Sequence, residues 1–185
     1  MKFFKFLFII FISLTTSIKA DSKKIFIEQA AEGGNLIFIR HAYAPGNGDP
    51  TNFNLNDCST QRNLSDKGRS QAKKIGNFFK ENYIDIDKVL SSEWCRCKET
   101  ADLAFNNYIT KNFLNSFYSS KFAKNRNKQI KDLKRFINEW DGNKNLVLIT
   151  HYVLISELLN YAPSSGEMVI SNKNFKLINT YSLKY

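Results

Sequence analysis

The sequence has no internal repeat, no low-complexity tract and no interdomain linker, and it contains only three prolines and eight glycines in 185 residues. A chain of this length without a linker is predicted to form one domain with its own hydrophobic core. The apolar run at residues 6–12 is much shorter than a membrane-spanning helix. These absences disfavour a multidomain protein and an uncleaved membrane anchor.

The first twenty residues have the layout of a targeting segment. Lysines precede the apolar run at residues 6–12, and small and polar residues follow it up to Ala20. This order is typical of a secretory signal peptide with cleavage after Ala20. No cysteine follows that position directly, which disfavours a lipoprotein. We predict a signal peptide at residues 1–20 and a domain at residues 21–185 that is secreted or periplasmic, with no stable membrane insertion after cleavage.

Acidic residues are the minority, 17 against 27 lysines and arginines, so the formal net charge is +10. Three lysines would leave with residues 1–20, which lowers the charge to +7. Phosphate-bearing small molecules, anionic envelope polymers and nucleic acid are the partners that a basic exported protein favours. Much of the charge lies in residues 121–135, where Ile130, Leu133 and Ile137 have the spacing of a buried helical stripe. We therefore interpret these cations as the solvated face of a helix over residues 121–140 and predict no nucleic-acid partner.

Cysteine is also scarce, with three in the chain. Two histidines on separate strands and a Cys-x-Cys do not form a familiar zinc spacing, so we predict no metal site. Export would permit a disulfide. Cys95 and Cys97 are too close to be the obvious pair, so Cys58 is expected to bridge to one of them and leave one thiol free. Such a bond would stabilise the fold by roughly 3–4 kcal/mol.

Histidine is the rarest catalytic residue type here, with two in the chain, and each follows a short apolar run. His41 and the preceding Arg40 follow the strand-like run at residues 36–39, and His151 follows a similar run that ends at residue 150. A third run, residues 88–92, leads within a few residues to Arg96. Ligands bind beyond the carboxyl ends of strands in open α/β sheets. Two histidines and two arginines at such ends predict an anion pocket.

Strand-like and helix-like segments alternate along the rest of the chain. A loop rich in Gly, Pro, Asn and Asp covers residues 40–61, and Ser65 or Asp66 can cap the helix that follows. Alternating strands and helices predict an α/β fold, here a three-layer α/β/α sandwich with a mostly parallel central sheet. The expected strands are residues 36–39, 87–91, 108–114, 145–150, 168–170 and 175–183, and the expected helices are 66–83, 94–105, 121–140 and 153–161.

Four short motifs follow one another in a fixed order. They are Arg40-His41-Ala42, Leu64-Ser65-Asp66-Lys67-Gly68-Arg69-Ser70-Gln71-Ala72, Ser91-Ser92-Glu93-Trp94-Cys95-Arg96-Cys97-Lys98-Glu99-Thr100-Ala101 and Thr150-His151. Together they resemble the histidine phosphatase superfamily, also called the phosphoglycerate-mutase-like fold, over most of residues 21–185. The family's first motif is Arg-His-Gly, and Ala42 is a small replacement of its glycine that phosphatase branches also carry.

The resemblance implies a phosphatase that acts on a small phosphorylated substrate without a cofactor or a metal. His41 would be the nucleophile that carries the phosphoryl group. Arg40 and Arg96 would clamp its equatorial oxygens, and His151 would donate to the same oxygens. Asn47 falls where many members carry an Asn that helps to hold the phosphate.

The general acid is where the sequence departs from the family. Many members carry a Glu in a Leu-x-Glu pattern after the third strand, but residues 113–117 hold no carboxylate. Another branch uses an acid directly after the second His, where this chain has Tyr152. Glu93 is our first choice for this role, with Asp49 and Asp57 as alternatives. A missing acid favours good leaving groups, such as those of acyl phosphates, phosphoanhydrides or phosphohistidine, and it disfavours a mutase.

Two other functions stay open. One is a non-catalytic phosphate-binding pseudoenzyme, and the other is a basic protein whose residues 121–135 bind an anionic envelope polymer. Turnover of para-nitrophenyl phosphate without added metal separates the phosphatase from the pseudoenzyme. Salt-dependent polymer binding that survives loss of His41 would identify the polymer-binding protein.

Overall fold

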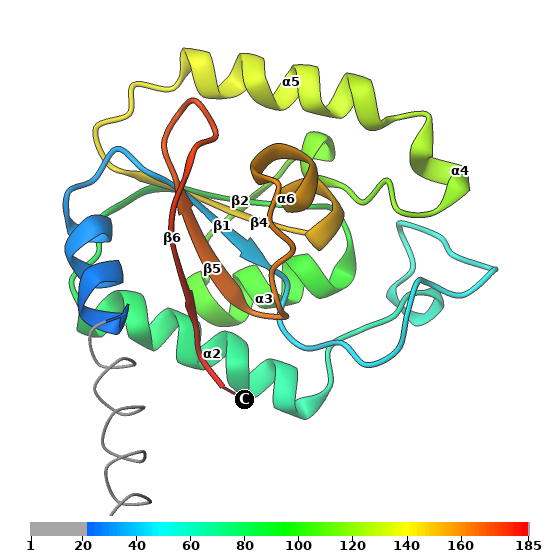
Figure 1. The fold of residues 1–185 in the computed structure, drawn as a ribbon. Coiled ribbons are helices and arrows are strands. Elements are labelled where there is room, and N and C mark those ends of the chain that lie inside the picture. Colours follow the sequence, from blue (N-terminus) through cyan, green and yellow to red (C-terminus); the bar gives the residue numbers. More distant parts are fainter. Residues whose placement is uncertain (1–21, 185) are drawn as a thin grey trace, which may run out of the picture.

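The computed structural model describes residues 22–184 (Figure 1). The predicted signal peptide at residues 1–20 lies outside the described residues. The described chain begins with a helix at residues 22–31, which buries Phe26 and Ala30 in the core. Within residues 22–184, no helix has both the length and the apolar character needed to cross a membrane.

A six-stranded sheet forms the middle layer, in the order β3-β2-β4-β1-β5-β6. Strands β3, β2, β4 and β1 are parallel, whereas β5 is antiparallel to β1 and β6 is antiparallel to β5. Because the parallel strands end at the same edge, the residues that follow β1, β2 and β4 meet there. The strands are β1 (Leu36–Arg40), β2 (Ile86–Ser91), β3 (Ile109–Thr110), β4 (Asn145–Thr150), β5 (Glu167–Ser171) and β6 (Leu177–Ser182).

Helices cover both faces of the sheet (Figure 1). The helix at residues 22–31 packs with α2 and α3 on one face, and α5 and α6 pack on the other. This arrangement confirms the predicted three-layer sandwich with a mostly parallel sheet. The longer helices are α2 (Asp66–Glu81), α3 (Cys95–Phe105), α5 (Arg126–Glu139) and α6 (Tyr152–Leu159), and the short ones are η1 (Cys58–Thr60), η2 (Asn112–Leu114) and α4 (Ser120–Ala123).

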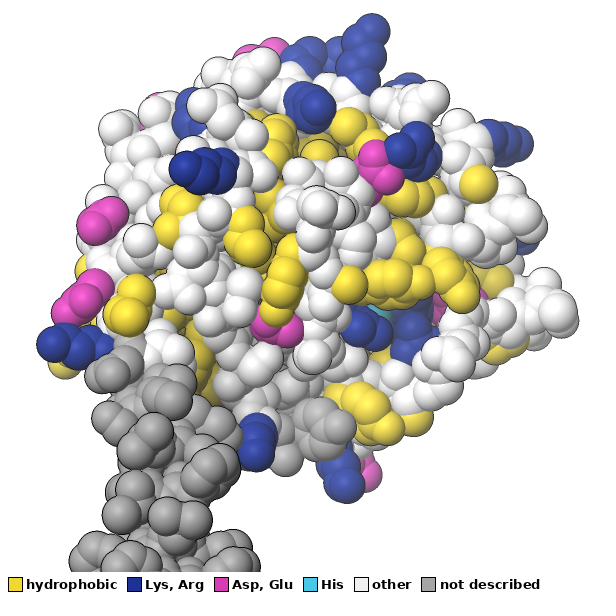
Figure 2. Space-filling view, in the orientation of Figure 1, with side chains coloured by type: hydrophobic (Ala, Val, Ile, Leu, Met, Phe, Trp, Pro, Cys, Tyr) yellow, Lys and Arg dark blue, Asp and Glu magenta, His cyan; other side chains and the backbone are white. Residues whose placement is uncertain are grey.

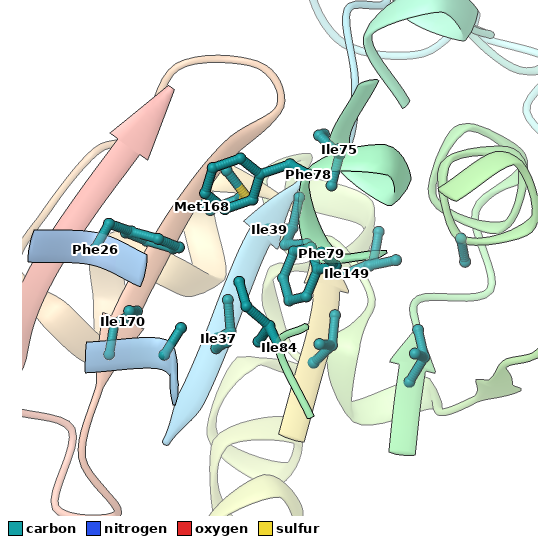
Figure 3. Packing of buried hydrophobic residues seen from close by; sticks show 14 of the residues in the cluster. Phe26, Ile37, Ile39, Ile75, Phe78, Phe79, Ile84, Ile149, Met168 and Ile170 are labelled. Carbon is teal, nitrogen blue, oxygen red and sulfur yellow. The ribbon is translucent and has the colours of Figure 1, made fainter. Parts of the chain in front are cut away.

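The central strands are apolar on both sides because helices cover both faces of the sheet. In β1, Ile37 and Ile39 contact the core beneath α2, which includes Phe78 (Figure 3). Leu36 and Phe38 alternate with them and belong to the core beneath α5 and α6. All four β1 side chains are fully buried. This two-sided burial explains why β1 reads as an unbroken apolar run, and it makes the strand a rigid support for the residues after it.

The third strand differs from the prediction over residues 108–114. Strand β3 is only Ile109–Thr110, and the 3₁₀ helix η2 follows it. Phe113 and Leu114 are consecutive, yet both are buried in the same core cluster. In a strand their side chains would point to opposite faces, so a helical turn is needed to bury both on one side.

The basic helix predicted over residues 121–140 is interrupted. It forms α4 and α5, with the break at residues 124–125. Phe122 turns toward Phe53 and Trp94, with ring centroids at 5.4 Å from each, and this contact fixes α4 in its own direction. All seven cations of residues 121–135 are exposed or partly exposed, as predicted for a solvated face. In the predicted stripe, Leu133 and Ile137 are buried and Ile130 is partly buried. Gln129, which the prediction did not include, is also buried.

Candidate active site

A cavity of about 260 Å³ lies at the edge where β1, β2 and β4 end. Arg40 is the last residue of β1, His41 and His151 directly follow β1 and β4, and Arg96 is in the first turn of α3, which follows β2. The four side chains and Asn47 all line the cavity. Figure 2 shows the opening as a hollow on the near face, with a histidine visible at its floor and Lys or Arg side chains around it. The structure therefore brings together five of the six site residues predicted from the sequence.

The hydrogen bond of His41 fixes which ring nitrogen can act as a nucleophile. Its Nδ1 lies 2.8 Å from the carbonyl oxygen of Ala42. A carbonyl oxygen only accepts, so Nδ1 carries the proton of the neutral ring and Nε2 keeps its lone pair. Burial, and next the charge of Arg96, lower the pKa of His41 well below its ordinary value, so the ring is neutral at physiological pH.

A chain of hydrogen bonds orients the second histidine. Glu93 accepts a hydrogen bond from Nδ2 of Asn115, which turns the Asn115 Oδ1 toward the hydroxyl of Ser92. Since Ser92 Oγ donates to that Oδ1, it accepts from the Nε2–H of His151 at 3.0 Å.

The Nδ1 of His151 is consequently the nitrogen turned toward the anion site, 3.4 Å from Nη2 of Arg96. The His41 and His151 ring centroids are 5.5 Å apart. Burial first, and then the charge of Arg96, hold the pKa of His151 well below its ordinary value.

Asp49 and Arg96 form an ion pair at the cavity wall. Nη1 of Arg96 donates to Oδ1 of Asp49 at 2.6 Å, and Nη2 donates to Oδ2 at 3.2 Å. The backbone N–H of Arg62 and the indole N–H of Trp94 also donate to this carboxylate. Burial pushes the pKa of Asp49 upward, but the bonds and charge of Arg96 outweigh that effect, and the net pKa is lowered. Asp49 is therefore held ionised, and it fixes the position of Arg96.

Two guanidinium groups still have free donors at this site. The Nε–H groups of Arg40 and Arg96 are buried and have no hydrogen-bond partner among residues 22–184. Nη1 of Arg40 donates to the carbonyl of Pro163 at 2.9 Å, and its guanidinium lies over the ring of Tyr152, 5.2 Å from the centroid. A buried donor without a partner costs free energy, and both guanidinium groups belong to residues that line the cavity.

Arg62 is a third arginine of the cavity that the sequence analysis did not identify. Its Nε donates to the carbonyl of Gly48 at 2.8 Å and its Nη1 to that of Ala44. Burial lowers the pKa of Arg62, and the positive charge of Arg96 lowers it further. The available signal was an arginine at the end of the glycine-rich loop, just before the Leu64-Ser65 motif. With Arg40, Arg62 and Arg96 against one carboxylate, the cavity is built for an anion.

The other predicted acids lie elsewhere. Glu93 does not line the cavity, and its carboxylate instead binds Asn115. Asp57 is exposed and caps η1 through Ser59. Among the described residues, Asp49 is the one carboxylate that lines the cavity. In residues 22–184, no group of three or more His, Cys, Asp or Glu side chains is arranged to hold a metal ion.

A disulfide joins the loop of the cavity to the helix that carries Arg96. Cys58 pairs with Cys95, with a Cα–Cα distance of 5.7 Å, which confirms one of the two predicted pairings. The third thiol, Cys97, is buried with its Sγ 3.5 Å from Nε2 of His151. Burial raises the pKa of Cys97 to about 12, so this thiol stays protonated.

Reduction of the Cys58–Cys95 bond should lower both stability and activity. The bond closes a segment with a sequence separation of 37 residues. Its loss should lower the free energy of unfolding by roughly 3–4 kcal/mol in the chain-entropy model. Activity should fall as well, because the bond ties the Asp49 loop to the first turn of α3. Urea unfolding and turnover, each with and without reductant, measure the two effects.

A Cys58→Ser variant is the matched control for that experiment. It should behave like the reduced protein and show no further change with reductant. Peptide mapping of unreduced protein should find one alkylatable thiol, Cys97. Three alkylatable thiols would contradict the pairing.

Comparisons of the sequence find a protein family and relatives that match part of the chain. The model of a family described as the histidine phosphatase superfamily (branch 1) matches residues 36–115. The mitochondrial serine/threonine-protein phosphatase Pgam5 of Drosophila virilis is 34% identical over 77 residues, which are 42% of this chain and 24% of the relative. Pgam5 of Drosophila grimshawi is 35% identical over 72 residues, 39% of this chain and 22% of the relative. The chain thus spans about a quarter of the length of these curated relatives.

Solved structures match most of the chain. The protein histidine phosphatase SixA complexed with tungstate has a TM-score of 0.53 and 16% identity, over 81% of this chain and 96% of SixA. A phosphoglycerate mutase from Thermus thermophilus has a TM-score of 0.53 and 15% identity, over 81% of this chain and 99% of the mutase. At these identities the likeness shows a shared fold, the phosphoglycerate-mutase-like fold predicted from the sequence.

Proposed function

We propose that the chain, whose residues 36–115 match the model of the histidine phosphatase superfamily, is a phosphatase that hydrolyses a phosphate monoester or a related phosphoryl compound through a phosphohistidine. The observation that carries the proposal is the neutral His41, whose Nδ1 proton is committed to Ala42 while Nε2 is left free beside three arginines. An unprotonated imidazole held at an anion site is an activated nucleophile. We further propose that the protein is exported, a location in which the Cys58–Cys95 disulfide would be stable.

In the first step, Nε2 of His41 attacks the phosphorus. A P–N bond forms as the bond from phosphorus to the leaving oxygen breaks, and the leaving group takes that electron pair. Charge on the equatorial oxygens is met by the guanidinium groups of Arg40 and Arg96, which line the cavity. His151 adds a donor once its Nδ1 takes up a proton, which the bound dianion favours by offsetting the charge of Arg96.

In the second step, water attacks the phosphohistidine. An O–P bond forms, the P–N bond breaks and its electron pair returns to Nε2 of His41. The released proton goes to the phosphate or to solvent. The arginines meet the charge in both steps, so we propose that turnover requires no metal ion.

The leaving group receives little help from the protein. Within the described part of the chain, Asp49 is the only carboxylate that lines the cavity, and Arg96 holds it ionised and hydrogen-bonded. An ionised carboxylate cannot donate a proton to the leaving oxygen. The protein should therefore prefer substrates whose leaving group departs as a stable anion.

This preference is testable with two substrates. Para-nitrophenyl phosphate should be turned over without added metal, whereas an alkyl ester such as glycerol phosphate should react at least about 100-fold more slowly, the lower end of what a general acid contributes. The measurement is kcat/KM for both esters on the same preparation. A pseudoenzyme would turn over neither.

The Asp49→Asn variant tests whether Asp49 acts as the general acid. If Asp49 only positions Arg96, the variant should lose activity on both esters by a similar factor and keep their ratio. A selective loss on the alkyl ester would make Asp49 the general acid. Equal rates of the parent protein on the two esters would refute the acid-free site.

A further inference from the structure

We propose that the substrate is a linear polyphosphate, whose terminal phosphoryl group enters the cavity while the rest of the chain lies along a basic surface formed by α4 and α5. The proposal rests on the phosphatase function above and names its substrate class. We define the α4–α5 basic surface as Lys121, Lys124, Arg126, Lys128, Lys131, Lys134 and Arg135.

The cavity is too small for most of a large substrate. At about 260 Å³ it lies just below the volumes of roughly 300–1,000 Å³ that hold drug-sized ligands. It therefore suits a terminal phosphoryl group and its nearest neighbour. The remainder of a longer substrate must leave through the opening, and the first residues of α4 form part of its wall.

Lys121 connects the cavity to the basic surface, because it lines the cavity and also belongs to α4. Beyond it, the exposed cations continue along α5, which is about 21 Å long. A shallow groove beside α5 is lined by Arg126, Lys131 and Lys134, together with Glu157 of α6. In Figure 2, Lys and Arg side chains lie on the same face as the hollow that contains the histidine.

The carboxylates near this surface neutralise only part of it. Asp132 pairs with Lys128 and Arg135, and Glu157 pairs with Arg126. Among the described residues, no carboxylate lies within 4.0 Å of the ammonium groups of the remaining four lysines. These are Lys121, Lys124, Lys131 and Lys134. Lys121 and Lys134 lie over the rings of Phe122 and Phe175, contacts that leave their charge uncompensated. Four lysines without a carboxylate partner, in continuity with an arginine-lined cavity, favour a polyanion with closely spaced charges.

The chemistry of the cavity agrees with this choice. His41 Nε2 would form a bond to the terminal phosphorus while the P–O bond of the anhydride breaks. The shortened chain then departs as a phosphate oxygen with the electron pair. A phosphate group has a second pKa of about 6, so this leaving group needs no proton at neutral pH. A site without a free general acid can therefore cleave a phosphoanhydride.

Single-stranded nucleic acid is the competing polyanion, and the surface lacks what it needs. Proteins that bind single strands combine cations with exposed aromatic rings on which bases stack. In the described part of the chain, the exposed large hydrophobic side chains are Ile25, Tyr83, Ile109, Tyr118 and Ile178. None of them is on α4 or α5, whose Phe122 and Phe136 are only partly exposed, and Tyr118 lines the cavity. The α4–α5 basic surface therefore offers many charges and little aromatic surface for base stacking.

The test compares long-chain inorganic polyphosphate with tripolyphosphate, which has only three phosphoryl groups. The parent protein should have a kcat/KM per chain end that is higher for the long chain. In a Lys131→Glu/Lys134→Glu variant this advantage should fall by about tenfold, the scale expected when two cationic contacts are lost and reversed. The advantage should also shrink as salt concentration rises.

A Lys67→Glu/Lys73→Glu variant is the matched control. It makes the same change in net charge on exposed lysines of α2, which lies on the opposite face of the sheet. This control should keep the preference for the long chain. An equal loss in both variants would reduce the effect to net charge and overturn the proposal.

Two further results would overturn it. One is a parent protein whose kcat/KM does not depend on chain length, and the other is single-stranded DNA competing as well as polyphosphate of equal charge. Turnover of para-nitrophenyl phosphate distinguishes failure of the polyphosphate proposal from failure of the phosphatase function. If it is hydrolysed while tripolyphosphate is not, only the polyphosphate proposal fails. If neither is hydrolysed, the phosphatase function fails and this inference fails with it.

Discussion

Replacing His41 by alanine should abolish turnover while leaving the protein folded. The loss should be on the order of 10⁶-fold in kcat, the scale found when an enzyme's covalent nucleophile is removed. Its neighbours are poor replacements, because Nδ1 of His151 lies 3.4 Å from Nη2 of Arg96, which donates to it, and burial raises the pKa of the Cys97 thiol to about 12. The measurement is turnover of para-nitrophenyl phosphate, with circular dichroism to check the fold.

Trapping the phosphoenzyme makes the same test more direct. Acid-free quenching after brief mixing with a labelled acyl phosphate should leave the label on the peptide that contains His41, and His41→Ala should carry none. Cys97→Ala is the matched control, since it also alters a buried group beside His151. That variant should still become labelled at His41. Labelled phosphate on the His41→Ala protein would disprove the nucleophile.

The pH dependence of this labelling follows from burial. The pKa of His41 is lowered, so the neutral nucleophile persists as the pH falls below the ordinary histidine value of about 6.5. Protonation of His41 Nε2, which occurs only around that lowered pKa, would remove the lone pair that attacks phosphorus. Labelling should therefore continue at pH values where an exposed histidine would already be protonated.

Much of the fold was predictable because the local pattern and the global structure agree. The apolar runs before His41 and His151 are buried on both faces, and such runs are typical of central parallel strands. Alternation of strands and helices then places Arg40, His41 and His151 at one edge without any knowledge of the loops. Arg96 follows from the same rule, because it lies in the first turn of the helix after β2.

The contacts of the loop were not predictable by this route. The segment between His41 and Leu64 has no helical or strand period, so its path depends on tertiary contacts. The Cys58–Cys95 bond and the Trp94 indole hold it against α3, and this brings Asp49 onto Arg96. Sequence distance gave no sign of that ion pair.

Glu93 illustrates a second limit. It is close to Arg96 in sequence, but its carboxylate binds Asn115, which is 22 residues away in sequence. The direction of a side chain is set by its partners, and Asn115 reaches Glu93 only because η2 turns after β3. The break between α4 and α5 has a similar origin, since Phe122 packs with Phe53 of a distant loop. In both cases a contact between residues far apart in sequence determines the local structure, and a local sequence pattern does not reveal such a contact.

Replacing Arg96 by lysine should be almost as harmful as replacing it by alanine. Loss of one donor to transition-state charge costs about 10²–10³-fold in kcat. A lysine keeps the positive charge, but its single ammonium cannot bind both oxygens of Asp49 and also present a donor to the phosphoryl group. Both variants should therefore lie at least about 100-fold below the parent in kcat.

Arg96→Ala should also destabilise the fold, because it leaves Asp49 without its counter-charge. The Arg96 and Asp49 side chains are 3% and 15% exposed, and breaking a buried pair on one side costs about 3–5 kcal/mol. The double variant Arg96→Ala/Asp49→Asn removes the unpaired charge as well, so it should recover much of the stability, measured by urea unfolding, and none of the activity. This separation would assign Arg96 two distinct roles, one in holding the loop through Asp49 and one in binding the phosphoryl group. If the double variant recovered activity together with stability, Arg96 would serve only to hold the loop, and Arg40 and Arg62 would remain as the phosphoryl clamp.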